Sequence, residues 1–138
     1  MKKIIVGVDG SGLSLKAFER ALSDVACQGG EVIVVCVAEM LSTLSLKKFD
    51  DQAYKRLIRH HRDILDEFLE KGKQSKVKIK GVLEAGRPAS ILARLAREEK
   101  ADEIIVGSQG KDAEQKMLLG HVSSRLIEIA PCSVVVVR

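Results

Sequence analysis

The segment Glu31–Ala38 contains the run VIVVCVA, which is apolar at almost every position. A continuous apolar strand has to be covered on both faces, because it has no polar side that could meet water. Such strands are typical of parallel sheets that lie between two layers of helices. This one run therefore favours a parallel sheet within an α/β fold.

The rest of the chain alternates between strand and helix patterns. Helical spacing of apolar residues predicts helices around residues 15–25, 51–71, 91–96 and 120–129, and short apolar runs predict further strands at Lys3–Val8, 77–83, Glu103–Val106 and Ser133–Val137. Right-handed crossovers place the connecting helices on both faces of such a sheet. We expect a single domain over residues 1–138, and a less central position for the alternating strand at 77–83.

Composition and charge argue against several classes of protein. The net charge is only +4, the charges are interspersed, and aromatic residues make up 3% of the chain, so base stacking and nucleic-acid binding are not expected. The cysteines Cys27, Cys36 and Cys132 are far apart in apolar surroundings, which predicts buried thiols in a reducing compartment. The N-terminus does not resemble a signal peptide and no run has transmembrane length. We expect a soluble, cytoplasmic protein with no membrane partner.

Two strand ends carry unusual residues. The first strand ends in Val8-Asp9-Gly10-Ser11, and the fourth ends in Gly107-Ser108-Gln109-Gly110, with Gly120 following nine residues later. Ligands of open α/β sheets bind beyond the carboxyl ends of the strands, where the strand order reverses. If the first and fourth strands are neighbours, both loops line one crevice.

The glycines suit a phosphate group. Backbone N–H groups hold phosphate best where no side chain intervenes, which gives Gly107 and Gly110 a role. Gly120 begins a helix, whose free N–H groups and positive dipole end favour an anion, and Lys111 could add a charge. Asp9 could accept hydrogen bonds from a ribose hydroxyl, an adenine amino group or a metal-bound water. Each feature also has a structural alternative: a turn at Gly107 and Gly110, or helix caps at Gly120 and Asp9.

These glycines and several other segments of the sequence resemble a known family. The spacing Gly107-x2-Gly110-x9-Gly120 is similar to the G-2x-G-9x-G-[S/T] motif of the ATP-binding universal stress proteins. The segments KKIIVGVDGS, EAGRPASIL, ADEIIVGSQGK and APCSVVVVR also resemble that family, so the resemblance covers the whole chain. It implies a three-layer, Rossmann-like fold of the adenine nucleotide alpha hydrolase type, with an open five-stranded parallel sheet in the order 3-2-1-4-5.

The resemblance also implies the residues that contact a nucleotide. The adenine and ribose contacts would be Gly7, Val8, Asp9 and Val37; the ribose and phosphate contacts would be Gly107, Ser108, Gln109, Gly110, Lys111, Asp112 and Ala113; the phosphate end would be Gly120, His121, Val122 and Ser123. The chain departs from the motif at His121, where the family has Ser or Thr. It also places Asp112 and Glu114 in the phosphate loop, where carboxylates repel a triphosphate unless they point outward or share a metal.

The leading hypothesis is a regulatory module of stress responses that binds ATP, with Mg or Mn as a candidate metal. Hydrolysis would be slow or absent, because no residue is placed to activate a water. The alternative is an interaction protein of the same fold that binds no nucleotide, and a third hypothesis is a true ATPase. On the leading hypothesis an unidentified protein partner would recognise the loop from Ser108 to Lys116. The last strand, Ser133–Val137, needs cover if it lies at a sheet edge, and the resemblance implies that it pairs with its twin in a homodimer.

The adjacent histidines His60 and His61 are not candidates for the site. They lie on a charged helix, and neighbours in sequence do not face each other on a helix. We expect both to be solvated.

Overall fold

The computed structural model describes residues 1–39, 51–109 and 120–138. In these ranges the chain forms, in order, β1 (Lys2–Val8), α1 (Gly12–Gln28), β2 (Gly30–Glu39), α3 (Asp51–Gly72), β3 (Lys78–Gly86), α4 (Pro88–Glu99), β4 (Glu103–Gly107), α5 (His121–Ile129) and β5 (Ser133–Val137). Each of these strands and helices was predicted from the sequence to within a few residues. The predicted contacts Gly110, Lys111, Asp112 and Ala113 lie outside the described residues, as does Glu114.

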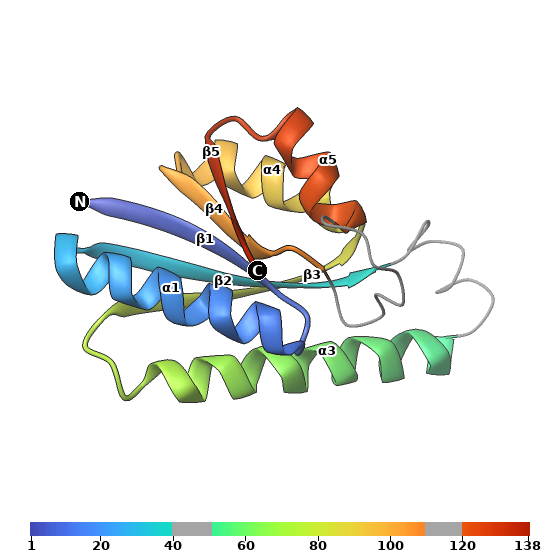
Figure 1. The fold of residues 1–138 in the computed structure, drawn as a ribbon. Coiled ribbons are helices and arrows are strands. Elements are labelled where there is room, and N and C mark those ends of the chain that lie inside the picture. The colour runs from blue at the N-terminus through green and yellow to red at the C-terminus, as the bar shows by residue number, and fades with distance from the viewer. Residues whose placement is uncertain (40–50, 110–119) are drawn as a thin grey trace.

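The five strands form one parallel sheet in the order β3-β2-β1-β4-β5, which confirms the predicted fold. Helices α1 and α3 cover one face of the sheet, and α4 and α5 cover the other (Figure 1). The strand order reverses beside β1, whose residue Ile4 is paired with Val32 of β2 on one side and with Glu103 of β4 on the other. The alternating strand β3 lies at one edge, as its pattern indicated, and β5 lies at the opposite edge.

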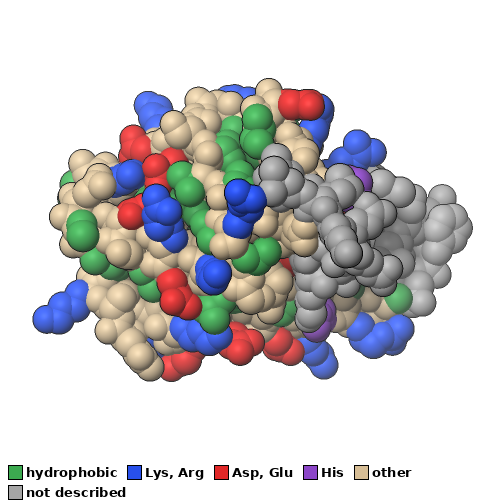
Figure 2. Space-filling view, in the orientation of Figure 1, with side chains coloured by type: hydrophobic (Ala, Val, Ile, Leu, Met, Phe, Trp, Pro, Cys, Tyr) green, Lys and Arg blue, Asp and Glu red, His purple; other side chains and the backbone are tan. Residues whose placement is uncertain are grey.

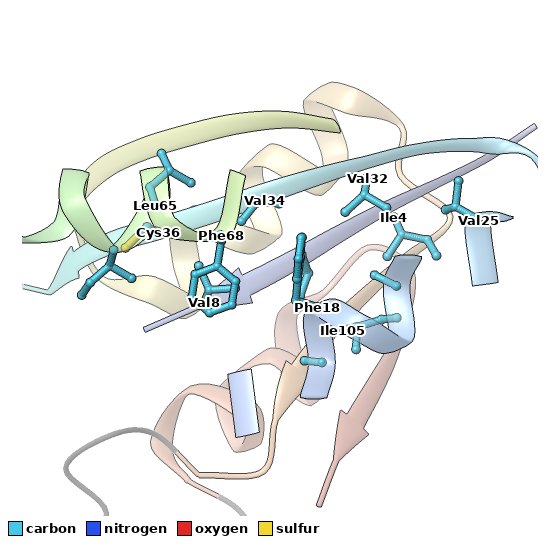
Figure 3. Close-up of a cluster of buried hydrophobic side chains, with 14 residues drawn as sticks. Ile4, Val8, Phe18, Val25, Val32, Val34, Cys36, Leu65, Phe68 and Ile105 are labelled. Atoms are coloured by element: carbon cyan, nitrogen blue, oxygen red, sulfur yellow. The ribbon is translucent and has the colours of Figure 1, made fainter. Parts of the chain in front are cut away.

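Alternate residues of the central strands point into two separate cores. On the α1 and α3 side, Ile4 and Val6 pack in one cluster with Phe18 and Phe68, whose rings meet edge to face at 5.4 Å between centroids (Figure 3). Ile5 belongs to the other cluster, beneath α4 and α5. The run 32–36 of β2 is almost wholly buried. The sheet is thus covered on both faces, as the continuous apolar run predicted.

Ion pairs join the amino ends of the strands. Lys2 contacts Glu103 at 3.3 Å, and Glu31 contacts Lys3 at 3.3 Å and Lys78 at 3.5 Å. Lysine, arginine and acidic side chains are interspersed over the surface shown in Figure 2. These lysines lie at the edge of the sheet opposite the carboxyl ends of the strands. Among the described helices, none is both long enough and apolar enough to span a membrane.

The three cysteines differ in burial more than the sequence indicated. Cys36 is buried, Cys132 is half-buried and Cys27 near the end of α1 is exposed. The prediction of three buried thiols is thus confirmed for Cys36, only partly met by Cys132 and wrong for Cys27. Val25 and Ala26 before it are apolar, but Gln28 after it is polar, and the Cys27 side chain is left exposed. Burial, followed by the charge of Asp9, raises the pKa of the Cys36 thiol to about 11.

The last residue of β4 lies very close to α1. A Cβ atom added to Gly107 would lie 2.8 Å from Cβ of Leu13, closer than real Cβ atoms approach. Helix α1 contacts both β1 and β4, so neither side can move freely to make room. The packing of α1 therefore requires glycine at position 107, whether or not a ligand binds nearby.

Substitution Gly107→Ala is expected to lower the free energy of unfolding by about 1–3 kcal/mol, the usual cost of overpacking a core. The loss should appear in urea unfolding of the ligand-free protein. Gly12→Ala is the matched control, because a Cβ there meets nothing within 4 Å, and it should leave stability unchanged or raise it by up to about 1 kcal/mol. Equal stabilities of the two variants would contradict the packing explanation.

Thiol labelling of the folded protein should distinguish Cys27 from Cys36 by their rates of reaction. The thiolate is the reactive species, and the raised pKa of Cys36 means that its thiolate forms only well above neutral pH. With Ellman's reagent at about pH 8, Cys27 should react rapidly and Cys36 only on unfolding. The Cys27→Ser variant should lose the rapid phase, because burial raises the pKa of the half-buried Cys132 thiol and slows its reaction. A rapid phase that keeps its full amplitude in this variant would contradict the assignment to Cys27.

Candidate functional site

A cleft of about 700 Å³ opens at the carboxyl ends of the strands. It is bordered by the ends of β1, β2 and β4, by the first residues of α4 and α5, and by one side of α3. Because α3 and α5 cover opposite faces of the sheet (Figure 1), the cleft lies across the sheet edge, beside the strand-order reversal. This is where open α/β sheets bind ligands.

The structure places most of the residues singled out in the sequence along this cleft. Those that line it are Gly7, Val8, Asp9, Val37, Gly107, Ser108, Gln109, Gly120, His121, Val122 and Ser123. They come from four elements and their adjoining loops, which are far apart in sequence. The loops after β1 and β4 therefore border one cavity.

The loop after β1 is held by its own side chains. The backbone N–H of Ser11 donates to Asp9 Oδ1 at 2.9 Å, and Ser11 Oγ accepts the N–H of Ser14 at 3.1 Å. Ser11 is thus the N-cap of α1, so the alternative in which Asp9 caps that helix does not hold. Gly10, with φ of +87°, allows the turn. The Asp9 carboxylate is positioned at the edge of the cleft by this turn.

The start of α5 is tied to the end of β4 through one carbonyl group. The Ser108 carbonyl accepts the backbone N–H of Gly120 and the hydroxyl of Ser123, the latter at 3.1 Å. Ser123 Oγ also lies 3.2 Å from the Gly120 carbonyl, and its side chain is buried. The hydroxyl of Ser123 therefore donates within the protein and fixes the position of the helix. The contact with a ligand that the resemblance implied for Ser123 stays a prediction, and Ser123 also lines the cleft.

The first turn of α5 presents backbone N–H groups to the cleft. Its N-cap is Gly120, which supplies no side-chain hydrogen bond to them, and His121 and Val122 both line the cavity. Uncapped N–H groups and the positive end of the helix dipole together favour an anion. The helix start is thus the part of the described cleft that suits a phosphate group.

An apolar wall lies next to this helix start. Val35, Leu92 and Val106 are buried side chains that line the cleft, and Val37 is half-buried beside them. They come from β2, α4 and β4. Aliphatic side chains of this kind can pack against a flat, weakly polar ring.

The opposite wall is formed by α3, and the sequence analysis missed it. Leu57, His60, His61 and Ile64 all line the cleft. His60 is exposed as predicted, but His61 is half-buried and its Nδ1 lies 2.9 Å from the Leu57 carbonyl. The two rings are in contact, edge to face, with centroids 5.3 Å apart. The spacing of Leu57, His61 and Ile64 by four and three residues marks one helix face and could have revealed this position.

The fixed charges of the described lining are negative. Asp9 and Glu39 border the cleft, and none of the described lining residues is a lysine or an arginine. The proximity of Asp9 contributes to the raised pKa of Cys36, after burial itself. Within the ranges 1–39, 51–109 and 120–138, no group of three or more His, Cys, Asp and Glu side chains could hold a metal ion.

Known proteins resemble this chain over its whole length. The family model described as "Universal stress protein family" matches residues 1–138. A Staphylococcus aureus (strain USA300) protein named as a universal stress protein is 32% identical over 139 residues, covering 99% of this chain and 84% of that protein.

Solved structures show the same fold. A universal stress protein crystallised in complex with cAMP superposes with a TM-score of 0.76 at 25% identity, covering 99% of this chain and 97% of the other. An Arabidopsis thaliana member of the family, solved with AMP bound, gives a TM-score of 0.64 at 18% identity, covering 99% and 91%. By its sequence over the whole chain and by its fold, the chain belongs to the universal stress protein family.

Proposed function

We propose that this protein binds an adenine nucleotide, ATP, in the cleft at the carboxyl ends of β1, β2 and β4. One observation carries the proposal. The uncapped start of α5, an apolar wall and the Asp9 carboxylate border a single cavity of about 700 Å³. These three features match the three parts of a nucleotide: phosphate, base and ribose.

Each part of the nucleotide has candidate partners. Backbone N–H groups of His121 and Val122 would hold the phosphates, together with the loop from Gly107 to Ala113. Val37, beside Gly7 and Val8, would flank the base, and the Asp9 carboxylate would accept hydrogen bonds from the ribose. The proposal gains support from the relatives solved with cAMP and with AMP, since both carry an adenine ring and a phosphate.

The protein would act as a regulatory module of stress responses, with slow hydrolysis or none. The bound nucleotide would stabilise the loop at residues 108–116, and a protein partner would recognise that loop.

Mg or Mn would be held mainly by phosphate oxygens, because Mg²⁺ takes only one or two carboxylates at such sites. A cytoplasmic location and a homodimer complete the proposal. The dimer would form through β5, whose valines Val134–Val137 are half-exposed at the sheet edge.

Binding can be tested on freshly purified protein. Mass spectrometry of small molecules released on denaturation should detect an adenine nucleotide, and a thermal-shift assay with magnesium should show stabilisation by ATP. Free ATP at 100 times its dissociation constant should stabilise the fold by about 2.7 kcal/mol. Gly110→Val should weaken the shift, because a branched side chain keeps the backbone away from a phosphate.

A matched glycine provides the control. Gly12→Val adds the same side chain at the start of α1, outside the described cleft lining, where a Cβ meets nothing within 4 Å, so it should retain the ATP-dependent shift. If neither a released nucleotide nor a shift at millimolar ATP is found, the proposal fails. The interaction protein that binds no nucleotide then becomes the better description, and the two carboxylates in the cleft lining would explain the result.

A further inference from the structure

All three histidines of the chain line the same cleft. His60 and His61 come from α3 on one face of the sheet, and His121 is the first residue of α5 on the other face. In Figure 2, histidine side chains lie at two places on the right-hand half of the molecule, one near the top and one near the bottom. The imidazole groups thus border the cleft from both of its walls.

These imidazoles are the only side chains in the described lining that can become positively charged. Asp9 and Glu39 are the charged side chains there, and the described lysines of the strands pair with acids at the opposite edge of the sheet. With neutral histidines the described lining carries a formal charge of −2. Three protonated imidazoles would bring it to +1. The formal charge of the described lining therefore changes sign with protonation of the histidines.

The ring of His61 is held by a hydrogen bond that leaves its Nε2 atom to respond to protonation. A carbonyl oxygen can only accept a hydrogen bond, so the Nδ1 atom that faces the Leu57 carbonyl carries the hydrogen. In the neutral ring Nε2 is then an acceptor, and on protonation it becomes a donor. A phosphate oxygen is an acceptor, so it can bond to Nε2 only in the protonated form.

The contact between His60 and His61 makes their protonation depend more strongly on a bound anion. Two protonated rings with centroids 5.3 Å apart repel each other, which disfavours the doubly charged pair. A bound phosphate group would offset this repulsion. The other charged groups nearby are Asp9 in the loop after β1, Glu39 of β2, and Arg56, Arg59, Arg62 and Asp63 on α3 itself. The α4 and α5 residues that line the cleft carry no charge other than that of His121.

We propose that His60, His61 and His121 supply a protonatable positive charge for the phosphates of the nucleotide, so that affinity depends on pH and on the number of phosphate charges. The proposal rests on the function proposed above. An anion close to an imidazole favours its protonated form. Affinity for the phosphates is therefore higher at lower pH and falls as the pH rises. ATP gains most from protonation, cAMP less, and adenosine nothing.

The test compares the protein with the double variant His60→Gln/His61→Gln by isothermal titration calorimetry at about pH 5.8 and about pH 8, on either side of the imidazole range. The terminal phosphate of ATP itself titrates near pH 6. It does so equally with both proteins, so the ratio of their dissociation constants isolates the histidines. For ATP this ratio should be near 1 at the higher pH and rise about tenfold at the lower, the effect of one pKa unit on binding. For adenosine it should not change.

A second readout distinguishes a charge effect from a structural one. Titrations in two buffers with different ionisation enthalpies measure the protons taken up with ATP, and the double variant should take up fewer. Arg59→Gln is the matched control: it removes a permanent charge from the same helix at an exposed position outside the cleft lining. Any effect of this control should be the same at both pH values. Melting curves at both pH values verify that each variant is folded.

The outcomes separate the two proposals. A ratio that is the same at both pH values, or one that rises equally for adenosine, would overturn the role of His60 and His61, and with it the proposal that the three histidines act together, while leaving ATP binding intact. Absence of ATP binding by the unaltered protein at both pH values would overturn the proposed function, and the role of the histidines with it. A pH-dependent ratio together with proton uptake that the double variant loses would establish His60 and His61 as protonatable charges of the site.

Discussion

The central strand β1 is enclosed on all sides, and the rest of the structure is arranged around it. Its residues Ile4, Ile5 and Val6 are fully buried, with alternate side chains entering the two cores. Its backbone pairs with β2 on one side and β4 on the other. Because the chain continues outward from β1 in both directions, the loops after β1 and β4 lead to helices on opposite faces. The cleft between those loops follows from this reversal.

The cleft combines features that favour an anion with features that oppose one. The start of α5 offers N–H groups, and Ser123 and Ser108 hold that helix start in place. Against this, Asp9 and Glu39 bring negative charge to the described lining. The balance between a helix dipole and two carboxylates is close, since each such interaction amounts to about 1 kcal/mol at a partly exposed site. Small changes in the charge of neighbouring side chains can therefore decide how strongly an anion binds.

Much of this site could be predicted from the sequence. Glycines and an aspartate after apolar runs mark strand ends, and Gly120 before a helical pattern marks a helix start. Most of the described cleft residues of β1, β4 and α5 were therefore identified, although Val106 of β4 was not. The α3 wall was missed, because a helix with many charges indicates a solvated face. The explanation of Gly107 from the sequence was also incomplete. The sequence indicated that glycine is needed there for a phosphate or a turn, whereas the structure shows that Leu13 leaves no room for a side chain.

The sequence by itself determined the order and type of the elements, because apolar periodicity and turn residues act over a few neighbouring positions. It also determined that the sheet is parallel and buried, since the run in β2 has no polar face. Only the tertiary structure decided that Cys27 is exposed, that Ser123 donates to Ser108, and that His61 borders the same cleft as Asp9. These relations depend on how each helix is rotated and packed against the sheet. That rotation is set by contacts between distant parts of the chain, which no local pattern encodes.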